Sequence, residues 1–154
     1  MRVVIIIGRD GPEILHTVWK IPAGGNIADN FWRSGNMLAA VDAASGEVKR
    51  VVRGVGPDQS EVETHPDTGR AIKGLVLPDW ERLKALCLDC ALIFHKLRYQ
   101  SWDVAPCPGG PIIVEVNTGA AFNLSQLATS EGFLNERFGR FLREFGFRKL
   151  GNEC

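Results

Sequence analysis

The chain has 154 residues, a length typical of one domain, which can bury enough apolar surface to fold without disulfides or a structural metal. Basic residues (Lys plus Arg) and acidic residues (Asp plus Glu) number 18 each, so the charge balance gives no general attraction to nucleic acid or to an anionic membrane. We therefore expect a single domain over residues 1–154, with neither nucleic acid nor a membrane as its partner.

The start of the chain predicts a strand and not a targeting segment. The apolar run at residues 3–7 is only strand-length and is followed at once by the turn sequence Gly-Arg-Asp-Gly at residues 8–11. Signal peptides and membrane spans need longer apolar segments. Four cysteines do not make a disulfide framework in a chain of this size, so free thiols and a cytoplasmic location are expected.

Two antiparallel hairpins are predicted in the first half of the chain. Residues 2–7 and 13–20 flank the first turn, and residues 37–42 and 48–53 flank a second turn at Ala-Ser-Gly. Two long polar connections, residues 21–35 and 54–74, interrupt this pattern. Loops of this length inside a compact domain are usually functional or disordered.

The clearest helix signal comes directly after Pro78. Asp79 is a candidate N-cap, and apolar residues then recur at helical spacing as far as Leu97. Cys87 and Cys90 form a Cys-x-x-Cys within this stripe, a spacing also found in zinc and redox sites. Because the sequence offers no second pair of ligands, we interpret them as small buried residues of the helix.

A second amphipathic helix is predicted around residues 133–145, where phenylalanines recur on one stripe. Such a stripe is more typical of core packing than of a cofactor site. The order of hairpins, helix, hairpin and helix predicts an α+β fold with a mostly antiparallel sheet and two amphipathic helices on one face.

The third hairpin, "SWDVAPCPGGPIIVEVNTG" at residues 101–119, carries two carboxylates within apolar strands. Strand alternation places Ile113, Glu115 and Asn117 on one face. If the Pro-Gly-Gly turn holds an odd number of residues, Asp103 lies directly opposite Glu115. Two carboxylates this close repel each other unless one is protonated or a cation lies between them.

Three oxygen donors, from Asp103, Glu115 and Asn117, would then converge on one face of the hairpin. Carboxylate and amide oxygens suit Mg²⁺ or Mn²⁺ better than zinc, and Mg²⁺ usually completes its shell with water and substrate phosphates. The pattern therefore predicts a metal that arrives with a nucleotide. The alternative is that Glu115 and Asn117 only lie at a solvated sheet edge.

These residues carry a resemblance to a known family. "WDVAPCPGGPIIVEVN" resembles the C-terminal metal-binding hairpin of ATP-grasp ligases. Together "IADNFWRSGNMLAAVDAASGEV", "HPDTGRAIKGLVLPDW" and "NLSQLA" are similar to the sugar-transfer associated ATP-grasp branch, which is also grouped with alpha-L-glutamate ligase-like proteins. The resemblance spans residues 2–127 and implies the C-terminal subdomain of an ATP-grasp fold.

The resemblance implies roles for particular residues. Metal ligands would be Asp103, Glu115 and Asn117, which also contact the nucleotide through the metal. The family places an asparagine near the phosphates, here Asn30, and an arginine that stabilises the transferring phosphoryl group, here Lys20. Lysine departs from the family pattern, since it supplies a point charge without the bidentate fork of arginine. An ordinary strand-end lysine is the alternative.

The 54–74 connection supplies candidate contacts for the acceptor substrate at His65, Asp67 and Arg70. The alternative for them is a turn, because Asp-Thr-Gly is a common turn sequence.

The family reaction would phosphorylate a carboxylate with Mg-ATP and let an amine displace the phosphate.

In the family, an N-terminal subdomain supplies phosphate-binding lysines and the adenine hinge, and this sequence resembles only the region beyond the hinge. We therefore expect a truncated, ligase-like chain that is inactive alone and binds Mg²⁺ (or Mn²⁺) with ATP weakly or not at all. Three interpretations remain open: half of a split ligase completed by another chain, a non-catalytic binding module, or an interaction domain. The apolar residues 3–7, if they lie near a sheet edge, could also pair two copies into a homodimer.

Overall fold

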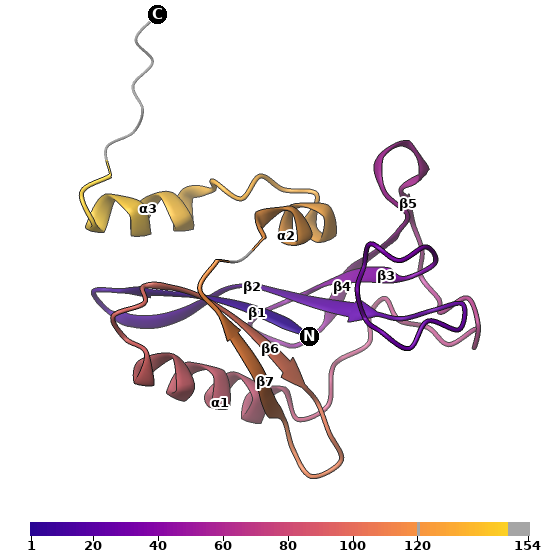
Figure 1. Ribbon diagram of the computed structural model, residues 1–154, viewed down its shortest axis with the longest axis horizontal. Helices are drawn as coiled ribbons and strands as arrows, with labels where there is room; N and C mark the ends of the chain where they lie inside the picture. The colour runs from indigo at the N-terminus through magenta and orange to yellow at the C-terminus, as the bar shows by residue number, and fades with distance from the viewer. Residues whose placement is uncertain (120, 148–154) are drawn as a thin grey trace, which may run out of the picture.

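The computed structural model describes residues 1–119 and 121–147, which build one antiparallel sheet with helices on both of its faces (Figure 1). The seven strands run in the order β5-β4-β3-β2-β1-β6-β7. In chain order they are β1 (Arg2–Gly8), β2 (Gly11–Ile21), β3 (Met37–Val41), β4 (Val48–Arg53), β5 (Ser60–Glu61), β6 (Tyr99–Ala105) and β7 (Ile112–Asn117). The helices are the short 3-10 turn η1 (Gly56–Asp58), α1 (Trp80–Ile93), α2 (Phe122–Thr129) and α3 (Glu136–Glu144). The α+β class and the antiparallel sheet are confirmed.

Strand β1 is an interior strand of the sheet, paired with β2 on one side and β6 on the other. Its side chains alternate between two cores: Val3 and Ile5 pack on the α1 side, whereas Val4 and Ile6 pack on the α3 side. The expectation that this strand lies near a sheet edge is therefore wrong. Both of its edges are hydrogen-bonded, so a homodimer would have no free edge of β1 to use.

The helices cover opposite faces of the sheet, as Figure 1 shows with α1 below it and α2 and α3 above. Helix α1 packs through Trp80, Leu83 and Cys87 on one core, and Phe141 of α3 packs on another. The placement of both predicted helices on one face is therefore not observed. The alternating apolar residues of β1 need cover on both sides, and α2, which the sequence patterns did not predict, adds a third helix over β2, β3 and β4.

The ends of α1 are fixed by different groups. Asp79 occupies the N-cap position in a left-handed conformation (φ 52°), but its side chain makes no capping hydrogen bond. At the other end Nε2 of the fully buried Gln100 lies 2.9–3.0 Å from the carbonyl oxygens of Ala91, Phe94 and Leu97, which share its two N–H donors. The helix therefore stops at Ile93, before the end of the apolar stripe.

Burial explains the chemistry of the cysteine pair in α1. Cys87 is fully buried, and loss of solvation raises the pKa of its thiol to about 12. The thiol is therefore protonated at neutral pH and packs as a small apolar group, as predicted, whereas Cys90 is only partly buried. No helix within residues 1–119 and 121–147 combines the length and the hydropathy needed to cross a membrane.

The β6–β7 hairpin pairs Asp103 directly with Glu115, which confirms the predicted pair. The reason given for it was wrong. Ala105 pairs with Ile112, which leaves an even number of residues in the turn, and the register shifts by one between Asp103 and Val104. The bulge adds Val114 to β7, so Ile113 packs on the α1 side and no longer shares a face with Glu115.

Gly46, in the turn between β3 and β4, is expected to tolerate no side chain. Its φ is +75°, and an added Cβ would lie 2.4 Å from Cγ of Trp80, the first residue of α1. We expect Gly46→Ala to lower the free energy of unfolding by about 2–5 kcal/mol, from left-handed backbone strain plus overpacking.

Gly69→Ala is the matched control, because Gly69 has φ +67° with nothing within 4 Å of the added Cβ. Gly69→Ala should lower the free energy of unfolding only by the cost of left-handed backbone strain, about 1–2 kcal/mol. Urea unfolding of both variants measures the difference, and equal losses would show that the contact with Trp80 is not restrictive.

Candidate functional site

The candidate site is a row of polar side chains that crosses four strands on the face covered by α2 and α3. Arg2 pairs with Asp103, and Asp103 pairs with Glu115, so these three side chains point to the same face. Asn117 lies two residues beyond Glu115 on β7. Lys20 lies two residues beyond Val18, the partner of Arg2 on β2. The pleat thus gathers residues far apart in the sequence.

Asp103 is held by two cations. Arg2 donates from Nε to Oδ1 at 3.0 Å and from Nη2 to Oδ2 at 2.9 Å, a bidentate pair, and Lys20 Nζ lies 3.4 Å from Oδ2. All three side chains are mostly buried, with exposed fractions of 11–18%. Arg2 and Lys20 thus supply the positive charge that the opposed carboxylates of Asp103 and Glu115 require. The sequence pattern predicts a metal in that role and does not predict these two side chains.

The balance of forces on Asp103 favours its charged form. Burial pushes the pKa of the carboxyl upward, but the hydrogen bond from Arg2 and the charges of Lys20 and Arg2 outweigh it, so the pKa lies below its ordinary value. Asp103 is therefore a carboxylate throughout the physiological range.

Lys20, near the end of β2, lies between two carboxylates. Its Nζ contacts Asp29 Oδ2 at 3.2 Å as well as Asp103, and only 11% of its side chain is exposed. Asp29 belongs to the loop of residues 22–36 and stands directly before Asn30. The ion pair thus ties the loop to the strand row.

The loop that carries Asn30 is organised by Asn36, which is 1% exposed. Its Nδ2 donates to the carbonyl oxygens of Ala28 and Asn30, and its Oδ1 accepts from the backbone of Ala23 and from Asn26 Nδ2, all within 3.0 Å. The side chain therefore uses its full hydrogen-bonding capacity. Asn36 is not among the residues predicted from the sequence, although an asparagine directly before an apolar strand in a glycine-rich loop is a usable signal.

Glu115 and Asn117 are the accessible members of the row. Asn117 Nδ2 donates to Glu115 Oε1 at 3.1 Å, and this orients the amide oxygen and leaves the second carboxylate oxygen free. Glu115 is exposed. Within residues 1–119 and 121–147 no cluster of three or more His, Cys, Asp or Glu residues could hold a metal.

The donor set nevertheless fits a magnesium ion that brings its own ligands. Two carboxylates and one amide oxygen share a face, and Mg²⁺ commonly takes one or two carboxylates plus water and phosphate oxygens. Asp103 accepts one hydrogen bond at Oδ1 and two at Oδ2, so one of the roughly four lone-pair positions of a carboxylate remains. The site therefore suits a metal delivered with phosphate better than a free ion.

The predicted acceptor residues hold one loop against another. Asp67 Oδ2 accepts from the backbone N–H of Gly24 at 2.7 Å, and His65 Nε2 lies 3.1 Å from the carbonyl oxygen of Pro22. His65 Nδ1 accepts from the backbone of Asp67, so the proton is on Nε2. These two side chains fix the loop of residues 22–36, while Arg70 is exposed beside them.

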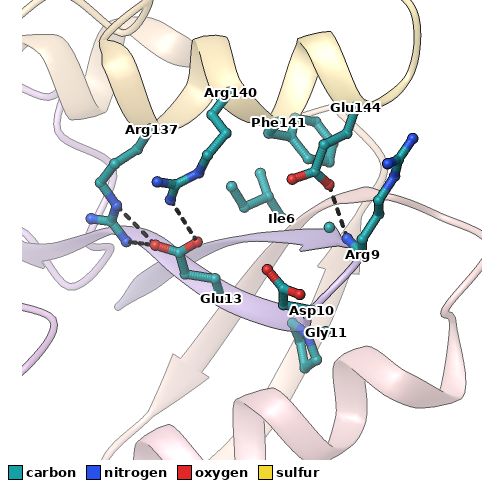
Figure 2. Close-up of a pocket in the computed structure, with 11 residues that line it drawn as sticks. Ile6, Arg9, Asp10, Gly11, Glu13, Arg137, Arg140, Phe141 and Glu144 are labelled. Carbon is teal, nitrogen blue, oxygen red and sulfur yellow. Dashed lines mark hydrogen bonds and ion pairs between the residues drawn. The ribbon is translucent and has the colours of Figure 1, made fainter.

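A cavity of about 150 Å³ lies outside this row, between the β1–β2 turn and α3 (Figure 2). Its charges neutralise one another. Glu13 accepts from Arg137, with Nε at 2.9 Å, and lies 3.9 Å from Arg140, while Glu144 accepts from the backbone of Arg9 at 2.9 Å. The cluster therefore anchors α3 to the hairpin.

Comparison with known proteins gives one family. The sequence model described as sugar-transfer associated ATP-grasp matches residues 1–140, which include every residue of the row and both loops. No curated protein and no solved structure is significantly similar to the chain.

Replacing Asp103 with asparagine should destabilise the protein at neutral pH. The change leaves Arg2 and Lys20 mostly buried without their shared carboxylate, which should cost about 1–3 kcal/mol of unfolding free energy. Asp89→Asn on the exposed side of α1 is the control and should change the stability by less than about 0.5 kcal/mol.

The pH dependence has a definite sign. Because the folded-state pKa of Asp103 is lowered, its stabilisation is present above the unfolded-state pKa of about 3.9 and is lost as the pH falls through the folded-state value. Urea unfolding at neutral and at acidic pH should show that the difference in unfolding free energy between the parent chain and the Asp103→Asn variant becomes smaller in acid. A difference that does not change with pH would contradict the charged role of Asp103.

Proposed function

Because the chain belongs to the sugar-transfer associated ATP-grasp family, we propose that the Arg2–Asp103–Glu115 row is a Mg-ATP site derived from a carboxylate–amine ligase. ATP-grasp proteins generally use ATP and Mg²⁺. The observation that carries the proposal is the register that sets Asp103 opposite Glu115 with Asn117 on the same face.

In this proposal Asp103, Glu115 and Asn117 hold Mg²⁺ (or Mn²⁺). When bound, the metal would neutralise charge on the phosphates of the nucleotide. Lys20 would lie beside the same phosphates, and its mostly buried ammonium supports a role in charge stabilisation. Asn30 would face them from the loop that Lys20 and Asn36 fix in place.

We further propose that this face needs a second layer for catalysis. Helix α2 packs over β2, β3 and β4, and α3 packs over β1, while Glu115 on β7 is exposed. An acyl phosphate formed on an open face would be reached by water. The layer that encloses the nucleotide would come from another chain or another segment, and the described residues alone would be inactive.

A non-catalytic binding module is the second candidate, and one observation favours it. Asp103 is already neutralised by Arg2 and Lys20, so the site is electrostatically satisfied without metal. Such a module would bind metal and phosphorylated ligands weakly and turn nothing over.

Metal binding is tested with Mn²⁺ and NMR. Paramagnetic broadening should concentrate on the backbone signals of residues 103, 115 and 117 and should increase when ATP is present. Glu115→Gln should weaken Mn²⁺ binding, and with it the broadening, by about tenfold or more, because it removes the accessible carboxylate. Glu81→Gln on the opposite face of the sheet is the control, and broadening centred on α1 would contradict the proposed site.

Nucleotide turnover is tested separately. The chain alone, incubated with Mg-ATP and mixed carboxylic acids and amines, should release no ADP above background in a coupled assay. Isothermal titration should show only weak ATP binding, since one face cannot exclude water from the phosphates. Turnover by the chain alone would contradict the requirement for a second layer and leave the metal ligands as proposed.

A further inference from the structure

A groove of about 630 Å³, called here the second groove to distinguish it from the cavity beside α3, is lined by none of the residues of the strand row. One wall is α2 with the residues directly after it, and the other is the connection between β4 and β5, with Trp32 contributed by the loop of residues 22–36. The groove contains none of the proposed metal ligands, so a ligand bound in it would not depend on the proposed function.

Trp32 presents an exposed aromatic face to this groove. Its side chain is 52% exposed, and the neighbouring Val55 is 45% exposed. Large apolar side chains that stay in solvent at the rim of a polar groove are typical of binding surfaces. Ile27, the other exposed large apolar residue of the loop of residues 22–36, does not line the groove.

The position of the indole is fixed by the fold. The Phe31 ring meets Trp32 edge-on, with a centroid distance of 5.4 Å, and Phe31 itself is buried against Leu124 and Ala128 of α2. The backbone N–H of Trp32 donates to Asn30 Oδ1 at 3.1 Å. Such pre-organisation lowers the entropic cost of binding.

The polar groups around Trp32 are amides and hydroxyls more than charges. Asn123 and Gln126 of α2, Gln59 of the opposite wall and Ser130 line the groove. Gln126 uses Oε1 to accept from the backbone of Phe133, which orients its amide. Amides and hydroxyls both donate and accept, so they match ligand hydroxyls.

The charged residues of the groove disfavour an anionic ligand. The charge of the Arg50 guanidinium is already paired: Nε donates to Glu61, and Nη1 donates to the carbonyl oxygens of Leu127 and Ala128. The other charged lining residue is Glu131, an exposed carboxylate. A phosphate here would meet this negative charge without a free cation to balance it.

We propose that this groove binds a neutral sugar ring. The C–H face of a pyranose would lie on the indole of Trp32, and its hydroxyls would bond to the Asn123 and Gln126 amides and to Ser130. A sugar ring has both the flat apolar face and the rim of uncharged hydroxyls that this lining requires. The ligand would sit next to the loop that carries Asn30.

The test is an NMR titration of the ¹⁵N-labelled protein with methyl glycosides of glucose, galactose, mannose and N-acetylglucosamine. At least one should shift the Trp32 indole N–H signal and the side-chain amide signals of Asn123 and Gln126, with a dissociation constant in the millimolar range. Glucose 6-phosphate should bind several-fold more weakly than the methyl glucoside.

Variants separate binding from folding. Trp32→Ala should weaken binding about tenfold, Trp32→Phe by less, and Phe147→Ala, which removes another exposed aromatic, should leave it unchanged. The buried indoles of Trp80 and Trp102 report in the same spectra whether each variant is folded.

The inference is overturned if none of the four glycosides shifts the Trp32 signal, or if adenosine shifts it more strongly than every glycoside. Glycoside binding that survives Trp32→Ala unchanged in a folded variant would also overturn it, since the ligand would then occupy another surface.

Discussion

The constraint on which the structure depends is that β1 lies in the middle of the sheet with apolar side chains on both faces. Residues 3–7 are all buried, and they alternate between the core under α1 and the core under α3. A strand of this kind is stable only when both faces are covered, because each uncovered face would expose a row of branched side chains to water. The two-sided arrangement of the helices is the consequence.

The candidate site forms where this cover ends. Arg2 begins β1 and shares a face with the residues that pack under α3, yet it carries a guanidinium in place of an apolar side chain. Partial burial of that charge is tolerated because Asp103 on the neighbouring strand accepts two hydrogen bonds from it. The Arg2–Asp103 pair is therefore both the end of the core and the beginning of the polar row.

Buried polar side chains, and not regular secondary structure, position the loops around the site. Asn36 holds residues 23–30 with three hydrogen bonds to the backbone and one to the Asn26 side chain, and Asp67 attaches the 54–74 connection to the same loop at Gly24. A buried amide without hydrogen-bond partners at position 36 would be costly. The loop is therefore stable in the backbone conformation that satisfies the Asn36 amide. The same loop carries Asn30, whose Oδ1 accepts from the backbone of Trp32, and contributes Trp32 to the second groove.

The sequence by itself determined the elements whose signals are local. Alternation and turn residues located the first four strands and the third hairpin, the stripe after Pro78 located α1, and the Asp103–Glu115 pair was predicted before its register was known. Local patterns suffice here because the periods of two and of about 3.6 residues identify strands and helices directly.

Only the tertiary structure decided the features that join distant segments. It placed β1 centrally, set the helices on opposite faces, added the bulge at Val114 and gave Asp103 its two cations. Arg2 and Asp103 are separated by 101 positions in the chain. No local period relates residues so far apart, and their contact exists because β1 pairs with β6 in the sheet, with Arg2 opposite Asp103.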